Sequence, residues 1–131
     1  MTPHNPEPPG SLAGLTVLVV EDEMMIAMAI EDMLRDLGCE VVKASRIKRA
    51  LQLAATTGLD GAILDINVAG EMVFPIARIL RERGIPFVFS SGYGMGKLPP
   101  DLRDVPMLPK PFHEEELGPL LARTFASIPN G

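Results

Sequence analysis

The sequence has few of the residues that build disulfides and zinc sites. Its single cysteine, Cys39, excludes an internal disulfide and is typical of a protein from a reducing compartment. The two histidines, His4 and His113, lie far apart in the chain and form no cluster with the spacing of metal ligands. We therefore predict that Cys39 is a small core residue and that His113 lies at the start of a helix.

Long apolar runs and an excess of basic charge are missing as well. No run approaches the roughly 18 apolar residues that a membrane-spanning helix needs, and the N-terminus lacks the basic-then-apolar order of a signal peptide. We expect a soluble, cytoplasmic protein with no membrane insertion. The net charge of -5, from 12 basic and 17 acidic residues, argues against nucleic acid as a partner and favours Mg²⁺ or a basic protein surface.

The chain is long enough for one domain and too short for two. It has 131 residues, of which 47% are hydrophobic, and this suits a single core without a separate output domain. Four prolines within residues 1–10, together with the lack of core-forming side chains there, predict disorder. We predict a disordered tail over residues 1–14, one domain over residues 15–128 and a short tail over residues 129–131.

Strand-like apolar runs alternate with amphipathic patterns of helical spacing. The predicted strands cover residues 15–20, 39–44, 62–65, 86–89 and 105–109. Short connections between strand and helix imply parallel strands joined by right-handed crossovers. The expected fold class is α/β, a doubly wound parallel sheet of five strands.

One predicted helix is interrupted. The segment 90–100, which follows the fourth predicted strand, contains three glycines and two prolines, and both residue types oppose helix formation. We predict that the fourth helix is short or disordered.

Methionines crowd the start of the first predicted helix. Met24, Met25, Met28 and Met33 could form a soft binding surface or fill gaps against the sheet. Methionine in an amphipathic helix is more often core filler, and we predict a buried position for all four.

Acidic, hydroxyl and ammonium groups fall at the carboxyl ends of four predicted strands. They are Glu21 and Asp22 after the first strand, Asp65 on the third, Ser91 after the fourth and Lys110 after the fifth. Such ends share one edge of a parallel sheet, so these side chains are expected to converge on one crevice. Crowded carboxylates raise one another's pKa unless a divalent cation binds them, and oxygen ligands without histidine or a second cysteine favour Mg²⁺ over Zn²⁺. Asp65 is the candidate nucleophile.

Each of these residues also has a simpler explanation. Asp65 could merely end a strand, Lys110 could be a solvated surface lysine, and Ser91 could be a turn hydroxyl. Ser90 is a competing candidate for the role of Ser91. Their joint occurrence at one predicted crevice favours the functional interpretation.

The ordered motifs resemble the receiver domain of two-component response regulators. The resemblance rests on Val19–Glu23, the strand ending in Asp65, the strand ending in Ser91, and Lys110–Phe112, and it covers nearly the whole predicted domain. It implies the strand order 2-1-3-4-5 of flavodoxin-like sheets. It also implies that Asp65 accepts a phosphoryl group from a histidine kinase or a histidine phosphotransfer protein, and that the signal passes by contact to a downstream protein target.

The same resemblance implies a set of metal ligands. Asp22 and Asp65 would bind Mg²⁺, and Glu21 would help through water. The backbone carbonyl of Asn67 would complete the ligands that the protein supplies.

Two further residues would bind the phosphoryl group. Lys110 would neutralise its charge, and Ser91 would hydrogen-bond a phosphoryl oxygen and draw its loop inward. The peptide bond between Lys110 and Pro111 is expected to be cis, as in receivers, which would aim the lysine into the crevice.

A closer resemblance is to the FAT GUY receivers. Phe89-Ser90-Ser91-Gly92-Tyr93 looks like the Phe-Ala-Thr-Gly-Tyr motif that follows the fourth strand in that group. Met107 stands where other receivers carry an aromatic switch residue. We therefore predict that the segment from Gly92 to Asp104 becomes ordered on phosphorylation. The predicted switch residues are Gly92, Tyr93, Gly94 and Met107.

Two other functions remain open. A phosphatase of the haloacid dehalogenase kind also uses an aspartate nucleophile and Mg²⁺, but it carries a general-acid aspartate where this chain has Asn67. A receiver-like binding module would keep the fold without phosphorylation. The intact set of crevice residues favours a signalling protein that is not an enzyme beyond its own phosphorylation and dephosphorylation.

Overall fold

The computed structural model describes residues 12–92 and 98–126. Along the chain the elements are β1 (Thr16–Val20), α1 (Met24–Asp36), β2 (Glu40–Ala44), α2 (Ile47–Thr56), β3 (Gly61–Asp65), β4 (Asn67–Val68), β5 (Glu71–Met72), α3 (Phe74–Glu82), β6 (Phe87–Ser91), the 3₁₀ helix η1 (Pro100–Leu102), β7 (Met107–Pro109) and α4 (Glu114–Ala126). Strand and helix alternate as predicted.

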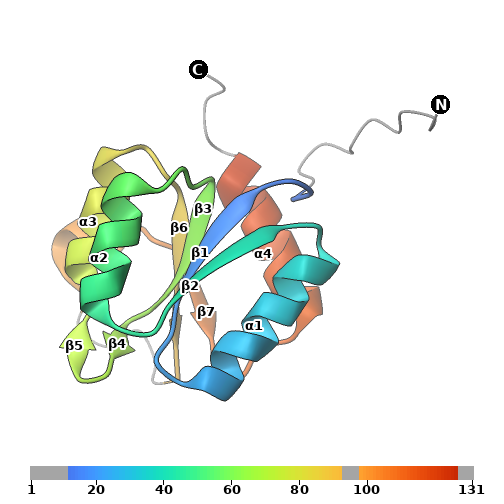
Figure 1. Ribbon diagram of the computed structural model, residues 1–131, viewed down its shortest axis with the longest axis horizontal. Coiled ribbons are helices and arrows are strands. Elements are labelled where there is room, and N and C mark those ends of the chain that lie inside the picture. Colours follow the sequence, from blue (N-terminus) through green and yellow to red (C-terminus); the bar gives the residue numbers. More distant parts are fainter. Residues whose placement is uncertain (1–11, 93–97, 127–131) are drawn as a thin grey trace.

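Five strands form one parallel sheet in the order β2-β1-β3-β6-β7. This confirms the predicted order 2-1-3-4-5, because β6 and β7 are the fourth and fifth strands of this sheet. Helices α2 and α3 cover one face and α1 and α4 the other (Figure 1). One buried apolar cluster fills the space on each face. The fold is therefore a three-layer sandwich with the sheet in the middle.

The prediction that the methionines of the first helix are buried is wrong for three of them. Met24, Met25 and Met28 are 75%, 82% and 50% exposed. The buried residues of α1 are Ala27, Ile30 and Leu34. Met25 and Met28 project away from that stripe, and Met24 lies in the first turn, past the end of β1. Only Met33 is partly buried against the core.

A short hairpin, β4 and β5, follows β3, where the sequence pattern indicates a loop up to Gly70 and then the start of a helix near Glu71. Its two strands pair antiparallel and are joined by Ala69 and Gly70. Both residues have positive φ, 52° and 87°, as a type I′ turn requires. Alanine rarely adopts this conformation. Strands of two residues are also too short to show the alternation of apolar and polar residues that identifies a strand in a sequence. No local pattern therefore indicates this hairpin.

In the described residues between β6 and β7, a single 3₁₀ turn, η1, stands in place of the fourth helix, which confirms the prediction that this helix is short. Leu98 and Leu102 are buried in the cluster under α2 and α3, and they anchor the segment that contains η1. The prolines and glycines before it leave too few good helix formers for a longer helix.

Two ion pairs hold this segment against α3. Arg78 lies 3.1 Å from Asp101, and Arg81 lies 2.9 Å from Asp104. The second half of the predicted switch segment therefore packs against α3. Its ordering on phosphorylation stays a prediction.

The N-terminal end of the described chain belongs to the core. Leu12, which the sequence pattern assigns to the tail, is 6% exposed and packs in the cluster under α1 and α4. Cys39 is buried beside it, with Sγ 3.4 Å from the Leu12 carbonyl, which confirms its prediction as a core residue. The rest of both predicted tails, residues 1–11 and 127–131, lies outside the described residues.

Helix α4 begins just after His113, as predicted. The backbone N–H of His113 donates a hydrogen bond of 3.1 Å to the Glu116 side chain, and its carbonyl accepts from the Glu116 N–H. This reciprocal pairing closes the first turn of the helix. None of the described helices combines the length and the hydropathy of a membrane span.

Candidate functional site

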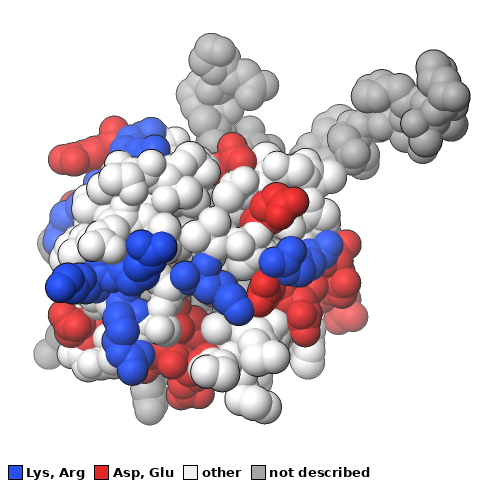
Figure 2. All heavy atoms as spheres, viewed as in Figure 1, with Lys and Arg blue, Asp and Glu red and all other residues white. Residues whose placement is uncertain are grey.

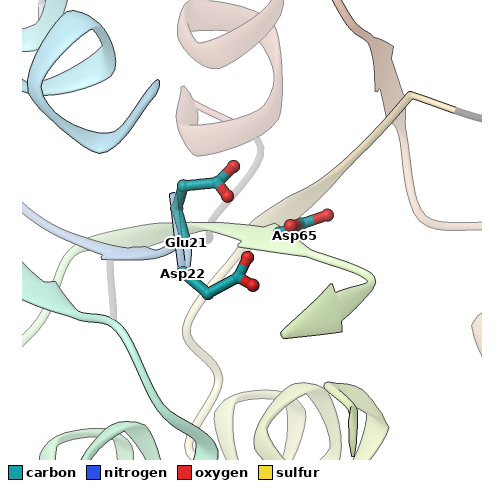
Figure 3. A group of neighbouring side chains, drawn as sticks. All are labelled: Glu21, Asp22 and Asp65. Carbon is teal, nitrogen blue, oxygen red and sulfur yellow. The ribbon is translucent and has the colours of Figure 1, made fainter. Parts of the chain in front are cut away.

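The predicted crevice residues meet at one edge of the sheet. Glu21 and Asp22 follow β1, Asp65 is the last residue of β3, Ser91 is the last of β6, and Lys110 follows β7. Because these strands are parallel and adjacent, their carboxyl ends lie together. Figure 3 shows the side chains of Glu21, Asp22 and Asp65 converging from two strand ends. One carboxylate oxygen of each lies within 4.8 Å of the others.

Lys110 joins two of these carboxylates. Its Nζ is 2.5 Å from Oε1 of Glu21 and 3.4 Å from Oδ2 of Asp65. The other Glu21 oxygen, Oε2, accepts a hydrogen bond of 3.1 Å from the backbone N–H of Glu23. The Lys110–Pro111 peptide bond is cis, which confirms that prediction. The lysine is therefore a partner of the acidic group and not a solvated surface residue.

Burial and charge shift the proton equilibria of this group. Desolvation, with the nearby Glu21 charge, raises the pKa of Asp65 to about 6, and the opposing effect of Lys110 is smaller. Burial alone would lower the pKa of Lys110, but the hydrogen bond with Glu21 and the charge of Asp65 outweigh it and raise that pKa. Asp65 is thus an unusually basic carboxylate beside a lysine that stays charged at neutral pH.

The hairpin positions Asp22 and Asn67. Oδ2 of Asp22 accepts a hydrogen bond of 3.1 Å from the Ala69 N–H, and Oδ1 of Asn67 accepts one of 2.9 Å from the Gly70 N–H. The Asn67 side-chain oxygen is therefore engaged inside the turn. A metal ligand from this residue would have to be its backbone carbonyl, the group that was predicted.

The three carboxylates fit a hard divalent cation. In octahedral Mg²⁺ the ligand oxygens lie about 2.1 Å from the metal, so opposite ligands are about 4.2 Å apart. The spacing of up to 4.8 Å between Glu21, Asp22 and Asp65 is close to this span. Three carboxylates and one ammonium also leave an excess of negative charge in a partly buried place. The donor set, all oxygen, suits Mg²⁺.

The two serines of β6 differ in their surroundings. Ser90 is 1% exposed and its hydroxyl has no hydrogen-bond partner among the described residues. Ser91 is half-buried at the edge that holds the acidic group. Consecutive residues of a strand face opposite sides, so the two hydroxyls project toward different layers.

Of the predicted switch residues, the structure describes Met107 and Gly92. Met107 is half-buried and packs against the cluster under α2 and α3, and Gly92 is exposed just after β6. Tyr93 and Gly94 lie outside the described residues.

Sequence reasoning missed a groove next to the site. It has a volume of about 490 Å³ and lies between α1 and the loop after β7. Residues that line it include Met25, Ile26, Met33, Lys110 and Phe112. Figure 2 shows uncharged surface where α1 begins, between acidic side chains on both sides. The cluster of methionines directly after the acidic pair is the sequence signal for this groove.

Residues 17–121 match the family described as the response regulator receiver domain. Among solved structures, SdrG from Sphingomonas melonis Fr1 is 37% identical with a TM-score of 0.73, and the match covers 86% of this chain and 96% of SdrG. The receiver domain of the sensor histidine kinase PA1611 from Pseudomonas aeruginosa PAO1, with a magnesium ion coordinated in its active site cleft, is 25% identical with a TM-score of 0.75, over 88% of this chain and 100% of that domain. The PhyR receiver domain of Erythrobacter litoralis is 26% identical with a TM-score of 0.79, over 91% of this chain and 95% of that one. No curated protein matches the chain by sequence.

Proposed function

Since the chain belongs to the response regulator receiver domain family, we propose that it accepts a phosphoryl group on Asp65 from a histidine kinase or a histidine phosphotransfer protein. Receiver domains are signalling modules of two-component systems and not enzymes in the ordinary sense. The observation that carries the proposal is the position of Asp65. It ends the central strand β3, lies within 4.8 Å of two further carboxylates, and has the Lys110 ammonium 3.4 Å away.

The reaction would be a transfer between two side chains. A carboxylate oxygen of Asp65 attacks the phosphorus of a phosphohistidine; the new P–O bond forms as the P–N bond breaks, and the electron pair of that bond stays on the imidazole nitrogen. Such transfers have loose transition states with charge on the phosphoryl oxygens, so the protein mainly positions and neutralises. The basic character of Asp65, whose pKa is about 6, favours attack, while the group is still mostly ionised at neutral pH.

Mg²⁺ held by Glu21, Asp22, Asp65 and the Asn67 carbonyl would supply positive charge against the phosphoryl oxygens. Lys110 would supply the second positive charge. In the ligand-free protein this lysine is bound more closely by Glu21 than by Asp65, at 2.5 Å against 3.4 Å. We expect its ammonium to shift toward the phosphoryl group once that group is in place.

Ser91 would provide a hydroxyl to a phosphoryl oxygen from the end of β6. Its position at the same strand edge as Asp65 supports this role. Gly92 follows directly, so a contact at Ser91 would pull on the start of the loop. We propose that the response is limited to this loop start, with Tyr93, Gly94 and Met107 as the other predicted switch residues, because the later part of the segment is already anchored to α3.

The groove beside α1 suits the phosphohistidine-bearing surface of the donor. A donor imidazole must reach Asp65, and the groove is adjacent because Lys110 both lines it and contacts Asp65. Exposed methionines adapt to the shape of an apolar partner surface. We therefore propose that Met24 and Met25 contact the histidine kinase or phosphotransfer protein, and that the chain meets this donor in the cytoplasm.

The decisive test is Mg²⁺-dependent binding of beryllofluoride, which mimics a phosphoryl group on a carboxylate. We expect the full-length wild-type chain to bind it saturably in Mg²⁺, with shifts of the Ser91 and Lys110 amide signals. Asp65→Asn should not bind, whereas Asp60→Asn, a carboxylate at the start of β3, should bind normally. A folded wild-type protein without binding would reject phosphorylation and favour a receiver-like module that acts by binding alone.

A further inference from the structure

The hydroxyl of Ser90 is a buried polar group with no hydrogen-bond partner in the part of the chain that the structure describes. The residue is 1% exposed, and its Oγ makes no hydrogen bond with any described residue. A hydroxyl that leaves water without gaining a hydrogen bond destabilises the folded state, and proteins keep few such groups. Alanine would fill almost the same space without this penalty. The hydroxyl therefore needs an explanation beyond the packing of the described residues.

Ser90 lies directly beside Asp65. The two residues are register partners in the parallel pair β3 and β6. Two residues earlier on these strands, the partners Ile63 and Val88 both pack under α1 and α4. Because side chains alternate along a strand, Asp65 and Ser90 face that same layer. Adjacent strands are about 4.8 Å apart, so side-chain rotations alone can bring Oγ of Ser90 to a carboxyl oxygen of Asp65.

In the ligand-free protein the Asp65 carboxylate does not use this neighbour. Its Oδ2 faces Lys110 at 3.4 Å, and it accepts nothing from Ser90. The Ser90 hydroxyl is thus adjacent to the acidic group without contributing to it.

A phosphoryl group would change what the Asp65 side chain offers. One carboxyl oxygen becomes the bridge to phosphorus, and the other becomes a carbonyl oxygen. The phosphoryl oxygens carry about two negative charges and attract the ammonium of Lys110. The carbonyl oxygen has two lone pairs, so it can accept a hydrogen bond from Ser90 and still be one of the proposed ligands of Mg²⁺.

We propose that Ser90 is a positioning residue of the phosphorylated state, which donates a hydrogen bond to the Asp65 side chain only when Asp65 carries a phosphoryl group. This inference rests on the proposed phosphorylation of Asp65. It gives the two consecutive serines separate tasks. Ser91 acts on the phosphoryl oxygens, and Ser90 acts on the carboxyl group that bears them, from the face under α1 and α4.

The test compares two equilibria of the full-length Ser90→Ala variant, with beryllofluoride and Mg²⁺ as the probe. We expect the urea midpoint of the ligand-free variant to rise above that of wild type, because the unsatisfied hydroxyl is gone. We expect its beryllofluoride affinity to fall about 5- to 10-fold, the effect of one neutral hydrogen bond. If Ser90 had a purely structural role, Ser90→Ala would not raise the urea midpoint and at the same time weaken beryllofluoride binding.

Ser91→Ala is the matched removal of a hydroxyl one residue away. Because Ser91 already has an interaction, this variant should lose beryllofluoride affinity without a higher ligand-free midpoint. If Ser90→Ala binds the probe as tightly as wild type, or has a lower midpoint, the role of Ser90 is overturned while phosphorylation of Asp65 stands. If wild type itself fails to bind, both the proposed function and this inference are overturned.

Discussion

The ammonium of Lys110 lies 2.5 Å from Oε1 of Glu21, and this ion pair is inside the protein. The two side chains are 16% and 1% exposed, although the residues are 89 positions apart in the chain. Asp65 is the more distant partner at 3.4 Å. Lys110 therefore pairs closely with Glu21 and remains near the carboxylate that we propose as phosphoacceptor.

Lys110→Met should destabilise the Mg²⁺-free protein by about 3 kcal/mol, because it leaves the Glu21 carboxylate buried without its cation. Urea unfolding at neutral pH measures this loss. The matched control is Lys43→Met, which breaks an exposed pair with Glu31 and should cost less than about 1 kcal/mol. Equal losses of stability in the two variants would show that the buried pair of Lys110 and Glu21 contributes no more than the exposed pair of Lys43 and Glu31.

The stability of the Mg²⁺-free protein should depend on the ionisation of Asp65. Its pKa is about 6 in the folded protein against an ordinary 3.8, so the folded state holds this proton more tightly than the unfolded state. The resulting stability is complete below about pH 3.8 and is lost as the pH rises through about 6.

The Asp65→Asn variant has an amide at this position, which does not ionise. It should therefore be more stable than wild type near pH 7.5, by about 1 to 3 kcal/mol. The difference should shrink toward pH 4. Urea unfolding of both proteins across this range tests the expectation. Parallel curves would mean that Asp65 is not the group with the raised pKa.

Mg²⁺ should raise the unfolding midpoint of wild type near neutral pH, because it relieves the repulsion among the carboxylates. Asp22→Asn should weaken Mg²⁺ binding at least about tenfold in titration calorimetry, since it removes one of three charged ligands. Asp32→Asn, which changes an exposed carboxylate on α1, should bind as wild type does. Unchanged affinity in the Asp22 variant would place the metal elsewhere.

Met25→Gln should slow phosphoryl transfer from a phosphohistidine protein at least about tenfold, because Met25 is 82% exposed and lines the groove beside the site. Transfer from acetyl phosphate, which needs no protein surface, should keep its rate. Met72→Gln changes an exposed methionine of the β4–β5 hairpin and serves as the control. A similar loss with both donors would indicate damage to the site and not to a docking surface.

Gly61→Ala should destabilise the fold by about 2 kcal/mol, because a Cβ at this position would lie 2.3 Å from the ring of Phe125. Thermal or urea unfolding measures the loss, and Phe125→Leu in the same chain should recover part of it. Gly58→Ala is the control, since a Cβ there meets nothing within 4 Å. A neutral Gly61 variant would show that α4 can shift away from the sheet.

Much of the fold could be predicted because its signals are local. The runs before Glu21 and before Asp65 are short, continuous and apolar, as in strands that are covered on both faces. The glycines and prolines after Ser91 exclude a regular fourth helix for the same local reason. The hairpin escaped prediction because Ala69 carries a positive φ that its side chain does not favour.

The exposure of Met25 could not be predicted from its helix alone. The spacing of apolar residues identifies the stripe of a helix that faces the core. Because methionines lie on several sides of α1, this spacing allowed more than one such stripe. The choice depended on which side of α1 packs against the sheet. That is a matter of packing between elements and has no local signal.

The sequence by itself determined the order of strands and helices and the chemical groups at the strand ends. The spacing of apolar residues and the identity of turn residues influence the backbone over only a few neighbouring positions, so they can be read locally. Only the tertiary structure decided that Lys110 pairs with Glu21, that the buried Ser90 hydroxyl beside Asp65 has no partner among the described residues, and that three of the α1 methionines face solvent. These relationships join residues far apart in the chain. They depend on strand register and on the seating of helices against the sheet, which arise only when the whole core packs together.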